Sequence, residues 1–129
     1  MNATRRGLVI DDDDISRELL ASTLREGGFK VFELPSPIGA TQLLVREALP
    51  LLILDLQMPD MSGDKLARLL RKNHRLHSLA ILLVSGGDER DLHRIATEVA
   101  ADGVVLKRNV RDGLLSAVNR VLLSRASRG

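Results

Sequence analysis

The sequence predicts an α/β fold, in which a parallel sheet is doubly wound with helices on both faces. Short, solidly apolar runs alternate with longer segments whose apolar residues recur at helical spacing, and this alternation occurs five times along the chain. The chain has 129 residues, 44% of them hydrophobic, which is enough to bury the core of one domain without disulfides. We therefore expect one parallel sheet of five strands with a helix after each strand.

The five strands are predicted from apolar runs that lack polar alternation, which is typical of strands buried on both faces of a sheet. These runs are residues 8–10, 31–34, 51–54, 80–84 and 104–106. Proline residues just after the second run break it and favour the start of the following helix. The polar turn that follows the fourth run separates it from the next helical segment.

The five helices are predicted from apolar residues three or four positions apart. The helical segments lie from Asp13 or Asp14 to Gly27, from Pro37 to about residue 48, at residues 64–74, after the turn at 85–88, and from Val110 onwards. The apolar stripes of the first and third helices are expected to be Ile15, Leu19, Leu20, Thr23 and Leu24, and Leu66, Leu69 and Leu70. Leu44 and Leu123 fall off their stripes, so we expect both to be exposed.

The composition excludes several classes of function. The chain has 19 basic and 17 acidic residues, a balance that argues against direct nucleic-acid binding. It contains no cysteine, which excludes disulfides and thiolate metal sites. No apolar stretch approaches the length of a membrane span, and the polar N-terminal residues are not expected to form a signal peptide. We therefore expect a cytoplasmic protein with no membrane partner.

Polar side chains follow four of the predicted strands. Asp11 and Asp12 follow the first strand, Asp55 the third, Ser85 the fourth and Lys107 the fifth. Because ligands bind outside the carboxyl ends of the strands in such sheets, we expect these side chains to lie on one rim. Three carboxylates that are close together repel one another unless a cation lies among them. Mg²⁺ is a hard cation that prefers oxygen ligands, so the sequence predicts a Mg²⁺ site at this rim.

The same residues suit phosphoryl transfer to a carboxylate. A carboxylate can attack phosphorus and form an acyl phosphate, a reaction that needs mostly positioning and charge neutralisation. Mg²⁺, the Lys107 ammonium and the Ser85 hydroxyl could each meet one oxygen of the transferred group. We therefore interpret Asp55 as the candidate phosphoacceptor.

Four segments of the chain resemble the signature segments of response-regulator receiver domains. They are residues 8–12, 52–63, 84–86 and 106–107, of which the segment around Asp55 is the most specific. The resemblance implies a flavodoxin-like fold with a five-stranded parallel sheet of order 2-1-3-4-5 and five flanking helices. It covers essentially the whole chain, so residues 1–129 are expected to form a single receiver domain with no output domain in this chain.

The resemblance also implies a function, which is that of a phosphorylation-dependent switch in a two-component system. Asp55 is implied to accept the phosphoryl group of a histidine kinase or phosphotransfer protein. The implied site residues are Asp12 and Asp55 as direct Mg²⁺ ligands, Asp11 through water, the Gln57 backbone carbonyl as a further ligand, and Ser85 and Lys107 on the phosphoryl group. Such a protein catalyses its own phosphorylation and dephosphorylation and turns over no outside substrate. The downstream target or effector domain stays open, as does a homodimer through the last helix.

Two residues depart from the family pattern. Arg108 follows Lys107 where the family usually has a proline after a cis peptide bond. A cis bond before another residue type costs roughly 2.5–4 kcal/mol, so we expect a trans bond with a rebuilt loop, or a strained cis bond. Val104 stands where the family commonly has an aromatic residue that turns inward on phosphorylation. Because valine has no ring to swing, we expect altered or weak transmission to the last two helices.

Two other functions stay open. The first is a degenerate receiver that acts as a phosphorylation-independent protein-interaction module, which the two departures favour and the intact acidic set opposes. The second is an aspartyl-phosphate phosphatase. Enzymes of that class usually have a second aspartate two residues after the nucleophile, where this chain has Gln57, and the chain lacks a cap domain to enclose a substrate.

Overall fold

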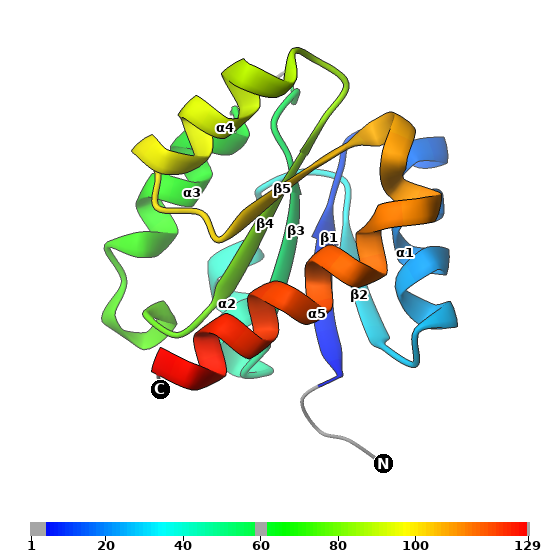
Figure 1. Cartoon of the computed structure of the whole chain (residues 1–129). Helices are drawn as coiled ribbons and strands as arrows, with labels where there is room; N and C mark the ends of the chain where they lie inside the picture. The colour runs from blue at the N-terminus through cyan, green and yellow to red at the C-terminus, as the bar shows by residue number, and fades with distance from the viewer. Residues whose placement is uncertain (1–4, 59–61, 129) are drawn as a thin grey trace.

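The computed structural model describes residues 5–58 and 62–128. Five parallel strands form one sheet in the order β2-β1-β3-β4-β5, with helices on both faces (Figure 1). The strands are β1 (Arg6–Ile10), β2 (Lys30–Leu34), β3 (Leu51–Asp55), β4 (Ala80–Ser85) and β5 (Gly103–Leu106). The predicted fold class and strand order are confirmed. Three residues of the second family segment, Pro59, Asp60 and Met61, lie outside the described residues.

The helices divide between the two faces of the sheet. They are α1 (Asp14–Glu26), α2 (Ala40–Arg46), α3 (Gly63–Arg71), α4 (Glu89–Glu98) and α5 (Val110–Arg128), with the short 3₁₀ helices η1 (His74–Leu76) and η2 (Lys107–Asn109). Helices α1 and α5 cover one face, and α2, α3 and α4 cover the other (Figure 1). Within the described part of the chain, no helix is both long and apolar enough to cross a membrane.

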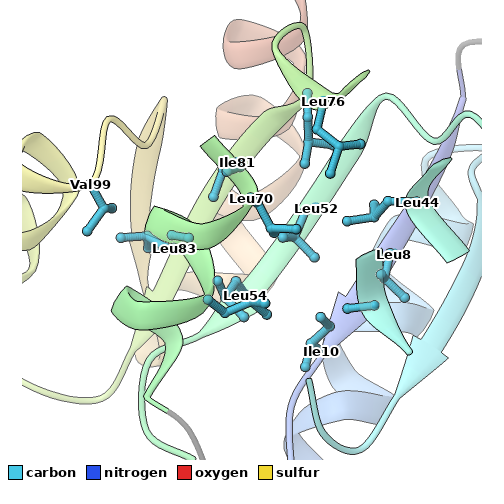
Figure 2. Packing of buried hydrophobic residues seen from close by; sticks show 14 of the residues in the cluster. Leu8, Ile10, Leu44, Leu52, Leu54, Leu70, Leu76, Ile81, Leu83 and Val99 are labelled. Carbon is cyan, nitrogen blue, oxygen red and sulfur yellow. The ribbon is translucent and has the colours of Figure 1, made fainter. Parts of the chain in front are cut away.

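Each strand contributes to two apolar layers, because successive side chains of a strand point to opposite faces of the sheet. Leu52 and Leu54 of β3 pack in the layer beneath α2, α3 and α4, which Figure 2 shows from close by. Leu51 and Ile53 pack in the layer beneath α1 and α5. All five residues of β3 are buried, which explains why its sequence shows no polar alternation.

Helix α1 begins and ends close to the predicted positions. Asp13 is its N-cap, and its Oδ2 accepts a hydrogen bond from the Ser16 N–H at 2.7 Å. Asp14 lies in the first turn and forms an ion pair with Arg17 at 2.6 Å. At the other end the backbone turns back toward β2 through Gly28, whose φ of 87° suits a residue without a Cβ. The aspartate run therefore serves both the helix start and the rim of the sheet.

Three apolar side chains lie elsewhere than the sequence predicted. Leu44 is fully buried, although it was expected to be exposed. Helix α2 is shorter than predicted, and its single inner face pairs Leu44 with Ala40, four residues before it. Leu69 is 57% exposed, because the buried face of α3 is formed by Leu66, Ala67 and Leu70, and Leu69 lies about 100° around the helix from Leu70.

Ile15 is 82% exposed, so its predicted place in the core was also wrong. The buried face of α1 centres on Leu20 and Leu24. Ile15 lies about 140° around the helix from Leu20, at roughly 100° per residue, and therefore at the outer edge of the predicted stripe. Leu123 is 70% exposed, as expected.

Candidate functional site

The carboxyl ends of β1 and β3 bring three aspartates together. Ile10 pairs with Leu54 in the sheet, so the next residues, Asp11 and Asp55, lie side by side beyond this pair. Carboxylate oxygens of Asp11, Asp12 and Asp55 all lie within 4.8 Å of one another. Asp11 and Asp55 are fully buried, and Asp12 is exposed. The three predicted carboxylates therefore form one cluster that is open to solvent at Asp12.

Lys107 reaches this cluster from β5. Its Nζ lies 3.4 Å from Asp55 Oδ1 and 3.7 Å from Asp11 Oδ2. Leu106, the residue before it, pairs with Ser85 at the end of β4, so Ser85 belongs to the same rim. Ser85 is buried, and its Oγ accepts a hydrogen bond from the Gly87 N–H at 3.1 Å. The rim thus carries carboxylates, an ammonium and a hydroxyl, as the sequence predicted.

Only one of the two carboxylate oxygens of Asp55 accepts a hydrogen bond from the described residues. Its Oδ1 accepts a hydrogen bond from the Gln57 N–H at 3.3 Å, whereas its buried Oδ2 has no partner among the described residues. Burial and the charge of Asp11 raise the pKa of Asp55 to about 6, against the lowering effects of the Gln57 N–H and Lys107. A divalent cation would supply the missing partner and offset the repulsion, so these residues fit Mg²⁺.

The first turn of α1 holds Asp11 in place. The Asp13 N–H donates to Asp11 Oδ1 at 2.9 Å, and the Ser16 hydroxyl donates to Asp11 Oδ2. The Arg17 guanidinium donates to the Asp11 backbone carbonyl at 2.8 Å. Sequence reasoning missed Ser16 and Arg17. The signal that could have found them is their position about one turn into the helix that folds back from the end of β1.

The position of Gln57 bears on its predicted role as a ligand. The residue follows β3 by two positions, and its backbone N–H faces Asp55. The role of its backbone carbonyl as a metal ligand stays a prediction.

The structure describes both positions that depart from the family pattern. No cis peptide bond occurs in the described ranges, and the chain passes from β5 straight into η2 at Lys107 and Arg108. The trans bond of the first alternative is therefore confirmed, and the rebuilding of the loop stays a prediction. Val104 is half-buried and packs against the apolar layer beneath α4. No aromatic ring is available at this position for a movement between outward and inward orientations.

Gly63, at the start of α3, lies close to the backbone of Asp55 and Leu56. A Cβ on this residue would lie 2.5 Å from the Asp55 carbonyl oxygen and 2.9 Å from Leu56 Cα, both of them backbone atoms. We expect Gly63→Ala to lower the free energy of unfolding by about 1–3 kcal/mol, because the backbone that carries Asp55 must shift. Urea unfolding followed by far-ultraviolet circular dichroism measures the change.

Gly113 in α5 provides the matched control for this prediction. A Cβ there would meet no atom within 4 Å. Because alanine is favoured over glycine inside a helix by about 1 kcal/mol, Gly113→Ala is expected to stabilise the protein. Equal effects of the two substitutions would contradict the close approach at Gly63.

Comparison with known proteins establishes the family. The family model of the response regulator receiver domain matches residues 8–119. The chain therefore belongs to the response regulator receiver domain family of two-component systems.

Individual relatives agree with this assignment. The chain is 33% identical over 127 residues to the transcriptional regulatory protein GltR of Pseudomonas aeruginosa, covering 98% of this chain and 52% of GltR. The chain thus spans about half the length of the curated relatives it matches. The chemotaxis protein CheY4 of Vibrio cholerae shares the fold, with a TM-score of 0.83 at 22% identity over 92% of this chain and 98% of that chain. The BeF3-activated receiver domain of RstA from Klebsiella pneumoniae has a TM-score of 0.80 at 26% identity, covering 91% of this chain and 97% of that chain.

Proposed function

We propose that this chain is a phosphorylation-dependent signalling switch in which Asp55 accepts a phosphoryl group from a histidine kinase or phosphotransfer protein. The observation that carries the proposal is the buried Asp55 Oδ2, which has no hydrogen-bond partner in the described part of the chain. The Asp55 carboxylate belongs to the cluster where Asp11, Asp12 and Lys107 converge. A reactive carboxylate with an open oxygen and nearby neutralising charge suits attack on phosphorus.

In the proposed reaction, an Asp55 oxygen forms a bond to phosphorus while the bond from phosphorus to the donor's imidazole nitrogen breaks. The electron pair of that bond stays on the imidazole, which then takes up a proton. Lys107 already lies 3.4 Å from Asp55 Oδ1 and would move with small adjustments onto a phosphoryl oxygen. The Ser85 hydroxyl would donate to a second oxygen.

Mg²⁺ would supply charge neutralisation at the remaining phosphoryl oxygen. Asp12, Asp55 and the Gln57 carbonyl would hold it directly, and Asp11 would hold it through water. Hydrolysis of the acyl phosphate by water would return Asp55 to its starting state. The proposal therefore includes self-phosphorylation and self-dephosphorylation but no turnover of an outside substrate, and it assumes a cytoplasmic phosphodonor.

The proposal predicts a covalent adduct on Asp55. Incubation with Mg²⁺ and acetyl phosphate, followed by intact mass measurement, is expected to show the mass of one added phosphoryl group. Asp55→Asn is expected to abolish the adduct, because the amide is not a nucleophile toward phosphorus. Asp91→Asn changes an exposed aspartate on α4 and should leave the adduct unchanged. A wild-type protein with neither adduct nor Mg²⁺ binding would overturn the proposal.

A degenerate receiver, acting as an interaction module without phosphorylation, is the second candidate. Val104 favours the interaction module. This half-buried valine has no aromatic ring that could change its orientation when Ser85 moves. The adduct measurement separates the two functions. An adduct on Asp55 supports the switch, whereas a protein that takes up no phosphoryl group supports the interaction module.

A further inference from the structure

We infer that Ser16 is a positioning residue of the proposed Mg²⁺ site, because its hydroxyl holds the Asp11 carboxylate toward Asp12 and Asp55. The inference rests on the proposed function, since it concerns the ion that the function requires. It adds a residue of α1 to a site that otherwise consists of residues at the carboxyl ends of strands.

The hydrogen bonds at Asp11 define the orientation of its carboxylate. Asp11 is fully buried, and each of its oxygens accepts one hydrogen bond, Oδ1 from the Asp13 N–H and Oδ2 from the Ser16 hydroxyl. An ionised carboxylate offers about four acceptor positions in total. Each oxygen therefore keeps capacity for a further partner, such as a water molecule that links it to a bound cation.

Repulsion from the neighbouring carboxylates favours rotation of the Asp11 carboxylate away from them, against the attraction of the Lys107 ammonium 3.7 Å from Asp11 Oδ2. Carboxylate oxygens of Asp11, Asp12 and Asp55 lie within 4.8 Å of one another, and like charges at this range repel. Rotation of the Asp11 side chain would relieve the repulsion but move its carboxylate away from the water molecule that would link it to the ion. The hydrogen bond from Ser16 opposes that rotation, as partners of metal ligands commonly do.

Ser16 is held firmly enough to act in this way. It is half-buried in the first turn of α1, and its own backbone N–H donates to the Asp13 cap at 2.7 Å. Arg17, the next residue, donates to the Asp11 carbonyl at 2.8 Å. The cap uses the backbone of Ser16 and not its hydroxyl, so loss of the hydroxyl leaves the helix start intact. A positioning role can therefore be separated from a structural one.

Calorimetric titration of the metal-free protein with Mg²⁺, without a phosphodonor, tests the inference. Ser16→Ala is expected to weaken Mg²⁺ binding roughly tenfold, the lower end of the range for partners of metal ligands, because Asp13 still holds the other oxygen. Ser16→Thr keeps the hydroxyl and is expected to retain most of the affinity. Ser22→Ala is the matched control in the same helix, because the Ser22 hydroxyl donates to the Leu19 carbonyl at 3.2 Å, away from the site.

The outcomes separate this inference from the proposed function. Wild-type affinity in Ser16→Ala overturns the inference and leaves the proposed function intact. Absence of Mg²⁺ binding by the wild-type protein also overturns the inference, and together with absence of the Asp55 adduct it overturns the proposed function itself. An equal loss in Ser16→Ala and Ser16→Thr also overturns the role of the hydroxyl. In an Asp11→Asn background, Ser16→Ala is expected to have little further effect, whereas an undiminished loss there would show that Ser16 does not act through Asp11.

Discussion

Asp102→Ala is expected to lower the free energy of unfolding by about 3–5 kcal/mol, the range for breaking a buried ion pair by removing one partner. The Asp102 side chain is 5% exposed and accepts hydrogen bonds from Arg71 at 2.8 Å and Arg125 at 2.7 Å. It also accepts a hydrogen bond from the Ile81 N–H at 2.8 Å. Alanine would deprive both guanidinium groups of this counter-charge and leave the backbone N–H without its acceptor.

The effect is large because Asp102 connects several elements near the amino ends of β4 and β5, at the end of the sheet opposite the candidate site. Arg71 comes from the end of α3 and also donates to the Leu79 carbonyl at 2.7 Å. Arg125 comes from α5 and also donates to the His77 carbonyl at 3.0 Å. Asp102 itself lies immediately before β5. Its carboxylate therefore fastens α3 and α5 to the starts of β4 and β5.

Urea unfolding monitored by far-ultraviolet circular dichroism measures this loss. Asp91→Ala is the control, because it removes an exposed aspartate whose ion pair with Arg94 spans 3.7 Å. We expect it to change stability by less than about 1 kcal/mol. Similar losses for the two substitutions would contradict a special role for the buried network around Asp102.

The sheet and the rim could be predicted from the sequence because each depends on short-range patterns. A strand buried on both faces must be apolar throughout, so β3 was recognisable at residues 51–54. Parallel strands also place their carboxyl ends together, and this rule alone is sufficient to group Asp11, Asp55 and Lys107. These predictions required only the order of the strands and the direction in which each runs.

The helix faces and the hydrogen-bond networks could not be predicted in the same way. Helical spacing defines a broad stripe but not its centre, which is why Leu44 was placed outside the core and Leu69 inside it. Ser16 contacts Asp11 only because α1 folds back over the end of β1 at a particular angle. Asp102 and Arg71 are 31 positions apart in the sequence, and their pairing depends on the packing of α3 against the rest of the fold.

Asp55→Asn is expected to stabilise the Mg²⁺-free protein at pH 7.5, although it removes the proposed phosphoacceptor. Burial and the Asp11 charge raise the pKa of Asp55 to about 6 in the folded state, compared with about 3.9 in an unfolded chain. A difference of about two pKa units corresponds to about 3 kcal/mol of destabilisation when the group is ionised. Asparagine has a similar shape and carries no charge, so we expect Asp55→Asn to raise the free energy of unfolding by roughly 2 kcal/mol.

The sign of the pH dependence tests the cause of this effect. Between pH 4 and 6 the folded state holds a proton on Asp55 that the unfolded state has lost, so the wild-type protein gains stability as the pH falls through this range. The advantage of Asp55→Asn should therefore be full above about pH 6.5 and shrink toward about pH 4. A hydrogen bond from Ser62 lowers the pKa of Asp64, so the Asp64 carboxylate contributes stability that is lost as the pH falls. Asp64→Asn should therefore lower stability at neutral pH, and this loss should shrink as the pH falls. Urea unfolding at several pH values in the presence of a chelator measures both variants. An advantage of Asp55→Asn that does not change with pH would show that shape, rather than the buried charge, limits the stability of the metal-free site.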